Sequence, residues 1–307
     1  MSIFYIPNNP FMSDFFKKLG WIIVDISLFL IIFGFLAFGI TSLLAIIPAV
    51  ASIGDDESFQ NPILLIITFF PLLISAAIAG YIVHYFVFKR DLALFGLQKQ
   101  GMVKDYCTGF LFGGLLILAG FFILRLLGYL DILNYNFAYG TIVLFLVFFI
   151  VQSLFEEIAF RSYLMPVIES RFGLWPALLI SSILFALIHL DNNNIAVLGI
   201  INIFLAGMLL GLLFIKYKNV WAAAGLHCSW NYVQSTILGF EVSGESVFNM
   251  IETQENGPDL ITGGAFGFEG SLISVLFLLG MILYYVQKNS YVMSRLDGMP
   301  QIEENIT

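Results

Sequence analysis

The chain has 307 residues, of which 60% are hydrophobic and 11% are charged. Soluble domains carry about 25% charged residues, so this composition, with a mean hydropathy of +0.94, indicates a polytopic membrane protein. The formal net charge of -8 is acidic and leaves no Lys/Arg-rich surface of the kind that nucleic-acid binders use, which excludes nucleic acid as a partner. Two cysteines cannot form a disulfide framework.

Apolar stretches separated by proline, glycine and polar clusters follow one another along the chain. A bilayer-spanning helix takes roughly 20 mainly apolar residues, and by this rule we expect spans near residues 21–49, 62–88, 107–129, 140–165, 175–190, 196–215, 220–238 and 266–286. The first stretch exceeds the ~7–15-residue apolar core of a secretory signal, so we expect it to be a retained helix. The fold class is therefore all-α: a polytopic membrane helical bundle with about eight transmembrane helices.

The distribution of Lys and Arg predicts the orientation, because basic residues are retained on the cytoplasmic side. Alternate connections hold Lys17, Lys18, Lys89, Arg90, Lys99, Lys104, Arg171, Lys216, Lys218, Lys288 and Arg295. The opposite connections hold Asp55, Asp56, Glu57, Asp191, Glu241, Glu245, Glu252, Glu255 and Asp259, with Arg125 as the one basic residue near that side. Both termini are thus predicted to be cytoplasmic. We expect a cytoplasmic N-terminal segment (1–20), a single transmembrane domain (21–287, motif core 140–238) and a cytoplasmic C-terminal tail (288–307).

Ionisable residues inside the spans need a partner or a cavity, since each costs about 2.5–3.5 kcal/mol on insertion scales. Asp25, His84 and Arg125 lie near the ends of spans, where snorkelling to the interface is the preferred explanation. The remaining polar residues fall on the fourth, fifth and seventh spans. They are Glu156, Glu157, Arg161, His189, His227 and Asn231.

Helical spacing brings these residues into register. Glu157 and Arg161 are four residues apart, so they share one helix face and can form an ion pair. Glu156 is turned by about 100° from Glu157 and can face a neighbouring helix.

The fourth and fifth spans are expected to form a hairpin that turns near Phe172. Glu156 precedes this turn by sixteen residues and His189 follows it by seventeen. At ~1.5 Å per residue both stand roughly 24–26 Å above the turn and can meet. His227 and Asn231 share one face of the seventh span. We expect the site to lie between the middle of the membrane and the cytoplasmic side.

Three functions are compatible with this set of residues: a structural polar network, an ion site in a transporter, and catalysis. A carboxylate, two imidazoles and an amide together favour chemistry, because they supply a water-activating base and oxyanion donors. Transporter folds are often built from two matching halves with paired broken helices, and the sequence shows neither. The acidic connection 239–265 is expected to be a solvated loop, with contact to a cationic peptide as the alternative.

Four short motifs occur in order on successive spans. They are "EEIAFR" from Glu156, "FALIH" from Phe185 to His189, "FLAGMLLG" with Gly207 and Gly211, and "HCSWN" from His227 to Asn231. This order resembles the EExxxR, FxxxH, glycine-bearing and HxxxN motifs of the CPBP intramembrane proteases. That family includes CAAX prenyl endopeptidases and bacterial bacteriocin-processing or self-immunity (Abi) proteins.

The resemblance implies an intramembrane endopeptidase in which Glu156 and His189 activate a water while His227 and Asn231 stabilise the oxyanion. Glu157, Arg161 and Phe185 would be supporting residues, and Gly207 and Gly211 would allow close helix packing. No cofactor is favoured, although Glu156, His189 and His227 leave a zinc site open as the alternative. The implied partners are the lipid bilayer and a membrane-embedded or lipid-anchored peptide, and the expected location is the bacterial cytoplasmic membrane. A transporter and a non-catalytic self-immunity protein remain the competing functions.

Overall fold

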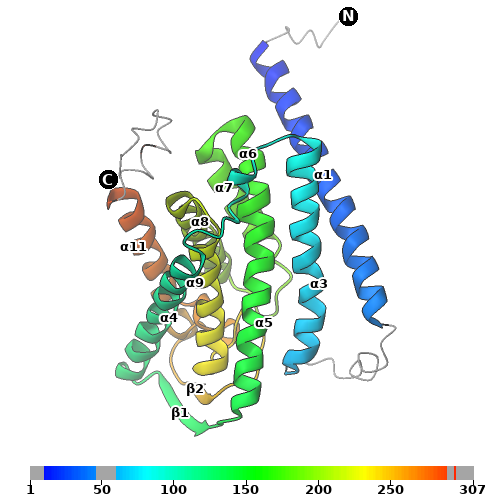
Figure 1. Cartoon of the computed structure of the whole chain (residues 1–307). Helices are drawn as coiled ribbons and strands as arrows, with labels where there is room; N and C mark the ends of the chain where they lie inside the picture. The colour runs from blue at the N-terminus through cyan, green and yellow to red at the C-terminus, as the bar shows by residue number, and fades with distance from the viewer. Residues whose placement is uncertain (1–9, 46–59, 289–293, 295–307) are drawn as a thin grey trace, which may run out of the picture.

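The computed structural model describes residues 10–45, 60–288 and 294 (Figure 1). Asp55, Asp56, Glu57 and Arg295, which contributed to the predicted orientation, lie outside this part of the chain, as do residues 1–9 of the N-terminal segment and most of the C-terminal tail. The helices are α1 (Pro10–Ala45), α3 (Pro62–Tyr81), α4 (Met102–Leu126), α5 (Tyr139–Glu157), α6 (Met165–Phe172), α7 (Leu174–Leu187), α8 (Val197–Tyr217), α9 (Trp221–Tyr232), α10 (Asp259–Thr262) and α11 (Leu272–Lys288).

The all-α membrane bundle predicted from the sequence is confirmed. Each of the eight predicted spans contains a helix, and five helices are long and apolar enough to cross a membrane: Ser13–Ala45, Pro62–Val87, Met102–Leu126, Tyr139–Phe172 and Val197–Tyr217. The helices in the other three predicted spans are shorter. For example, α7 has 14 residues, which at ~1.5 Å per residue is about 21 Å long.

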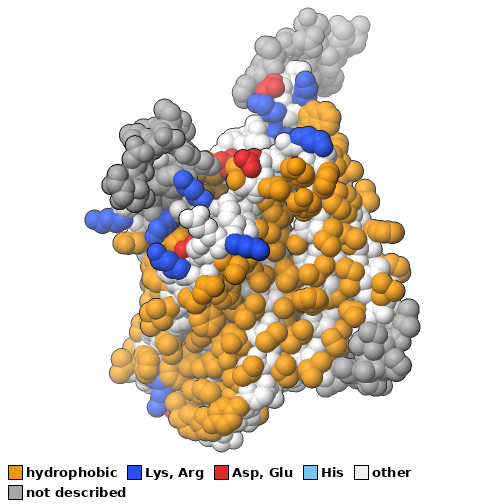
Figure 2. Space-filling view, viewed as in Figure 1, with side chains coloured by type: hydrophobic (Ala, Val, Ile, Leu, Met, Phe, Trp, Pro, Cys, Tyr) orange, Lys and Arg blue, Asp and Glu red, His pale blue; other side chains and the backbone are white. Residues whose placement is uncertain are grey.

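The two ends of the bundle differ in charge. Helix α1 begins, and α11 ends, at the same end of the bundle (Figure 1). Most of the Lys and Arg side chains visible in Figure 2 gather at this end, while hydrophobic side chains cover the middle of the molecule. This is the arrangement that the predicted topology requires, and the assignment of this end to the cytoplasm stays a prediction.

A small sheet closes the opposite end. Strand β1 (Leu130–Tyr135) follows α4 and pairs antiparallel with β2 (Ile251–Glu255), which belongs to the long connection after α9. The pairing ties that connection to the turn between α4 and α5. Part of the acidic 239–265 segment is therefore folded onto the bundle.

The hairpin predicted around Phe172 is present. Helix α5 continues through a π-helical segment, Ile158–Leu164, into α6, so the helix does not end at the glutamates. Gly173 makes the turn with a φ of 86°, in the left-handed region that glycine adopts without strain. Helix α7 then runs back and packs against α6, the π-helical segment and α8.

Helix α9 is held very closely by α4. A Cβ added at Gly109 of α4 would lie 2.0 Å from the carbonyl oxygen of Ala222, and one added at Gly225 of α9 would lie 2.1 Å from that of Tyr106. Only glycine permits this approach of two backbones. The position of α9, which carries two of the predicted catalytic residues, is thereby fixed.

Snorkelling was the wrong explanation for Asp25 and His84, because both side chains are fully buried. Asp25 pairs with Arg90 and lies 3.2 Å from Arg171, and the Tyr163 hydroxyl donates to its carboxylate at 2.7 Å. These partners come from the segment after α3 and from the base of the hairpin. Partners that are close in space replace the water that a snorkelling side chain would reach.

Candidate active site

The site forms where α5, the end of α7 and α9 meet. The Glu156 carboxylate oxygen Oε2 lies 4.0 Å from Nε2 of His189 and 3.8 Å from Nε2 of His227. This oxygen is buried and has no hydrogen-bond partner among the described residues. Three polar atoms from three helical segments therefore converge on one point, as the hairpin geometry predicted for Glu156 and His189.

The other nitrogen of each imidazole is occupied. His189 Nδ1 contacts the Phe185 carbonyl at 2.7 Å, and a carbonyl can only accept, so Nδ1 carries a proton. His227 Nδ1 contacts the Glu157 carboxylate at 3.0 Å and donates in the same way. Both Nε2 atoms are left to act at Glu156. His189 lies two residues beyond the end of α7, so it sits in a turn and not on the straight helix that the prediction assumed.

Glu157 and Arg161 form the expected pair. Arg161 Nε lies 3.3 Å from Glu157 Oε2, and the two side chains are 1% and 0% exposed. Arg161 also donates to the Gly207 carbonyl at 3.2 Å, and its guanidinium lies 4.4 Å from the centre of the Phe185 ring. The sequence analysis did not predict that Glu157 also accepts a hydrogen bond from His227. One carboxylate thus orients both Arg161 and a predicted catalytic residue.

A glutamine that the sequence analysis did not select connects Glu156 to Asn231. Gln152 donates to Glu156 Oε1, and Asn231 Nδ2 donates to Gln152 Oε1 at 3.2 Å. Gln152 precedes Glu156 by four residues and so shares its helix face. This spacing was the available signal.

The predicted packing glycines face α7. A Cβ at Gly207 would lie 3.1 Å from Ser182, and one at Gly211 would lie 2.4 Å from a methyl group of Leu178. The close approach of α8 brings the Gly207 carbonyl to Arg161. Phe185 contacts both imidazoles: the centre of its ring lies 4.8 Å from that of His189 and 6.0 Å from that of His227.

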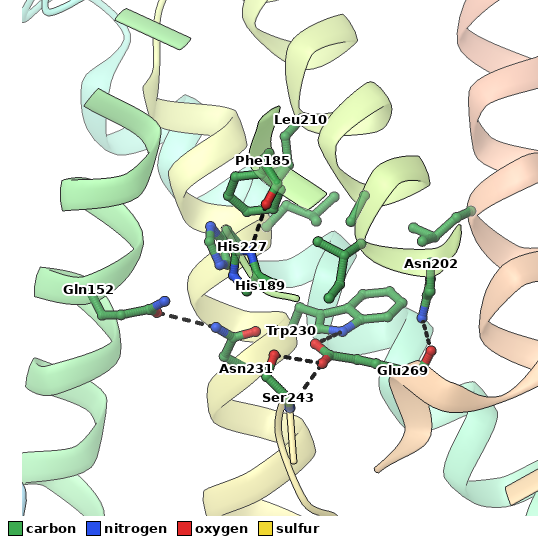
Figure 3. A pocket seen from close by; sticks show the side chains of 14 residues that line it. Gln152, Phe185, His189, Asn202, Leu210, His227, Trp230, Asn231, Ser243 and Glu269 are labelled. Carbon is green, nitrogen blue, oxygen red and sulfur yellow. Dashed lines mark hydrogen bonds between the residues drawn. The ribbon is translucent and has the colours of Figure 1, made fainter. Parts of the chain in front are cut away.

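Two cavities flank the convergence point. One, of about 60 Å³, is lined by His189, His227 and Asn231 together with Asn202 and Glu269 (Figure 3). The other, of about 200 Å³, is lined by Glu156 and shares His189 and Asn231 with the first. The catalytic candidates thus line two neighbouring cavities that share His189 and Asn231.

The larger cavity is lined in part by the connection that follows α9. Its lining includes Val242, Ser243, Glu245 and Val247, all from the connection that follows α9. That connection belongs to the end of the bundle opposite the Lys and Arg residues. This cavity therefore lies toward the end of the bundle opposite most Lys and Arg residues, and the depth of the site in the membrane stays a prediction.

A second buried carboxylate, Glu269, also escaped sequence analysis. The predicted last span, 266–286, placed it near the start of a helix, but α11 begins only at Leu272. Residues Phe268–Gly270 instead form a 3-10 turn that carries Glu269 into the smaller cavity. Its carboxylate accepts hydrogen bonds from Trp230 and Ser243 (Figure 3).

Residues 138–233 match the family described as type II CAAX prenyl endopeptidase Rce1-like. The match contains every residue of the four motifs and supports the resemblance to the CPBP/CAAX intramembrane proteases over this part of the chain. The long apolar helices and this match show an integral membrane protein whose matched part is similar to a CAAX-type protease. No curated protein matches the chain.

Proposed function

We propose that this protein is an intramembrane endopeptidase in which Glu156 activates a water for attack on a peptide bond. One observation carries the proposal: the unpartnered Oε2 of Glu156 faces two imidazole Nε2 atoms at 4.0 and 3.8 Å. These separations are too long for direct hydrogen bonds, which are about 2.8 Å, yet a single water between the atoms reaches two of them at that length. The geometry is that of a water site.

Glu156 and His189 would hold the nucleophile. The Phe185 carbonyl keeps the His189 proton on Nδ1, so Nε2 presents a lone pair that accepts a hydrogen bond from the water. Glu156 takes the water's second proton as the oxygen attacks the carbonyl carbon, and returns it to the leaving amine when the C–N bond breaks. A general base in this position contributes about 10²–10⁴ in rate.

His227 and Asn231 would stabilise the tetrahedral oxyanion. The ionised Glu157 accepts from His227 Nδ1 and favours the imidazolium form, in which Nε2 also carries a proton to donate. Asn231 Nδ2 uses one hydrogen on Gln152 and has a second for the oxyanion. One such donor is worth about 10²–10³ in rate.

Zinc is the alternative electrophile, since one glutamate and two histidines match a known catalytic donor set. Ligands about 2.1 Å from one tetrahedral ion lie roughly 3.4 Å apart, which is shorter than both distances between Glu156 and the histidines. No three His, Cys, Asp or Glu side chains of residues 10–45 and 60–288 are placed to hold a metal ion. We therefore favour the glutamate-dependent mechanism.

The substrate would be a membrane-embedded or lipid-anchored peptide, and the enzyme would act in the bacterial cytoplasmic membrane. The match to CAAX prenyl endopeptidases makes a farnesylated CAAX peptide the first probe. The larger cavity is lined by Phe69, Phe148 and Phe149. These rings suit an apolar segment of such a peptide.

The test is cleavage of this probe by purified protein in lipid nanodiscs, followed by mass spectrometry. Wild-type protein should release the C-terminal fragment, and Glu156→Gln or His189→Ala should abolish release while the protein remains folded. Retained cleavage in either variant contradicts the assigned base. A farnesylated peptide with a reduced, non-hydrolysable bond is the substrate control.

Metal dependence is tested separately. Activity should survive prolonged treatment with a strong chelator and should not rise with added zinc. Complete inhibition that zinc reverses would reject the metal-free mechanism. If no probe is cleaved although Glu156→Gln changes resistance of cells to a bacteriocin, the self-immunity alternative gains support.

A further inference from the structure

The mechanism proposed above makes no use of Glu269, although this residue lines the same cavity as three of the catalytic candidates. It is 8% exposed and lies close enough to His189 and His227 for an electrostatic interaction with both. A buried carboxylate beside a catalytic centre requires an explanation, because burial of this group is costly without compensation.

Burial opposes ionisation of Glu269, and the hydrogen bonds donated to its carboxylate counteract that effect. Trp230 Nε1 donates to Oε1 at 3.2 Å, and the backbone N–H and the hydroxyl of Ser243 each donate to Oε2 at 3.0 Å. Hydrogen bonds donated to a carboxylate stabilise its charge. Trp230 follows His227 by three residues on α9, so the same helix face presents both the imidazole and this donor.

No Lys or Arg among the described residues forms an ion pair with Glu269, whereas the two buried acids Glu157 and Asp25 each pair with arginine. The basic side chains that line the same cavity are His189 and His227. A cation that enters the cavity would therefore stabilise the buried, ionised carboxylate.

A second acceptor in the same cavity has no partner. Asn202 is 2% exposed, and its Nδ2 donates to the Glu269 carbonyl at 2.5 Å and to Ser274 Oγ at 2.7 Å. Its Oδ1 is buried without a hydrogen bond. Leaving such an acceptor unsatisfied costs about 1–3 kcal/mol, which a donor group on a ligand would recover.

The remaining wall of the cavity is apolar and includes Ile203, Ala206 and Leu278. Apolar walls leading to a carboxylate and an amide oxygen fit a side chain with an aliphatic stem and a cationic, hydrogen-bond-donating end. Lysine and arginine have this construction.

We propose that Glu269 and Asn202 form a subsite that selects peptide substrates with a Lys or Arg side chain next to the scissile bond. This inference rests on the proposed peptidase function and adds a substrate class to it. The subsite joins the catalytic water site through the cavity that His189, His227 and Asn231 also line. Glu245, at the larger cavity, adds negative charge on the path from the acidic end of the bundle.

The test uses pairs of farnesylated peptides in nanodiscs, in which each position around the scissile bond carries either lysine or the uncharged, similarly shaped norleucine. Wild-type enzyme should prefer lysine at one position by about tenfold in kcat/KM, a typical value for a charge-assisted contact. Glu269→Gln, which keeps the shape and removes the charge, should abolish this preference while the norleucine peptide is still cleaved.

Ser243→Ala is the matched control, because it removes a hydrogen bond to the same carboxylate and leaves the charge in place. It should retain the lysine preference. An equal loss on both peptides in Glu269→Gln would show that Glu269 only supports the structure and would overturn the subsite, as would the absence of any lysine preference in wild-type enzyme.

A binding measurement separates this inference from the proposed function. This measurement needs no turnover and uses the Glu156→Gln protein. That variant should bind the lysine peptide more tightly than the norleucine peptide, and adding Glu269→Gln should remove the difference. Peptides that bind with this selectivity but are never cleaved by wild-type protein would reject the peptidase function and keep the subsite. Equal binding of both peptides rejects the subsite.

Discussion

Replacing Glu157 by glutamine should both destabilise the protein and inactivate it. The side chain is fully buried and pairs with Arg161, which is itself 1% exposed. Among the described residues, Arg161 has one further polar contact, the Gly207 carbonyl. Removing the negative partner of a buried ion pair costs about 3–5 kcal/mol, because the remaining charge is uncompensated. We expect the free energy of unfolding in detergent micelles to fall by about this amount.

The neighbouring residue supplies a matched control. Glu156→Gln makes the same chemical change one position earlier, where the side chain contacts Gln152 and two imidazoles but no arginine. This variant should keep wild-type stability and lose activity. An unfolding free energy for Glu157→Gln equal to that of Glu156→Gln would refute the claim that Arg161 depends on Glu157.

The activity of Glu157→Gln provides a second measurement. Because Glu157 also accepts from His227 Nδ1 at 3.0 Å, its neutral replacement favours the imidazolium less. We expect cleavage by the folded variant to fall by about 10²–10⁴, the range for a misoriented or wrongly protonated histidine. Activity near wild type, measured below the unfolding transition, would show that His227 does not need this carboxylate.

Three further changes test the packing and the charge of the fold. Gly109→Ala should destabilise the protein, because the added methyl group forces α4 away from the Ala222 carbonyl. Gly34→Ala is the control: an added Cβ there meets nothing within 4 Å, so stability should be unchanged or higher. Thermal unfolding in detergent compares the two variants, and equal unfolding temperatures would contradict the close contact. Burial raises the pKa of Glu255 to about 7 from its ordinary 4.5, so the unfolded chain loses this proton first and stability should fall between roughly pH 4.5 and 7. Glu255→Gln should remove that part of the pH dependence, and an unchanged profile would argue against it. Asp25→Asn should lower the unfolding free energy by about 3–5 kcal/mol, because two partly buried arginines, Arg90 and Arg171, lose their carboxylate, and a wild-type value would mean that water compensates for it.

The helical parts of the site were predictable from the sequence because periodicity is preserved within a helix. The pairing of Glu157 with Arg161 depends on a four-residue spacing. The meeting of Glu156 with His189 depends on their nearly equal numbers of residues from the same turn. Both predictions hold, although Arg161 lies in the π-helical segment that follows α5.

The parts made by loops were not predictable. Ser243 reaches Glu269 from the connection after α9, and residues 266–271 read as the start of a span because they are apolar and glycine-rich. Composition cannot show that such a segment folds into a 3-10 turn against a cavity. The same limit applies to Asp25, since its partners Arg90 and Arg171 are distant in sequence and only tertiary packing brings them together.

The Asp25 cluster sets an order on assembly in the membrane. Helix α1 is synthesised first, and its buried aspartate lies 65 residues before Arg90 and 146 residues before Arg171. Until the hairpin of α6 and α7 has been made, α1 lacks both the second arginine and the Tyr163 hydroxyl that Asp25 contacts in the finished protein. The final docking of α1 must therefore follow insertion of the segment that carries the proposed catalytic glutamate, so the first helix to enter the bilayer reaches its native contacts only after the helix of the candidate site is in place.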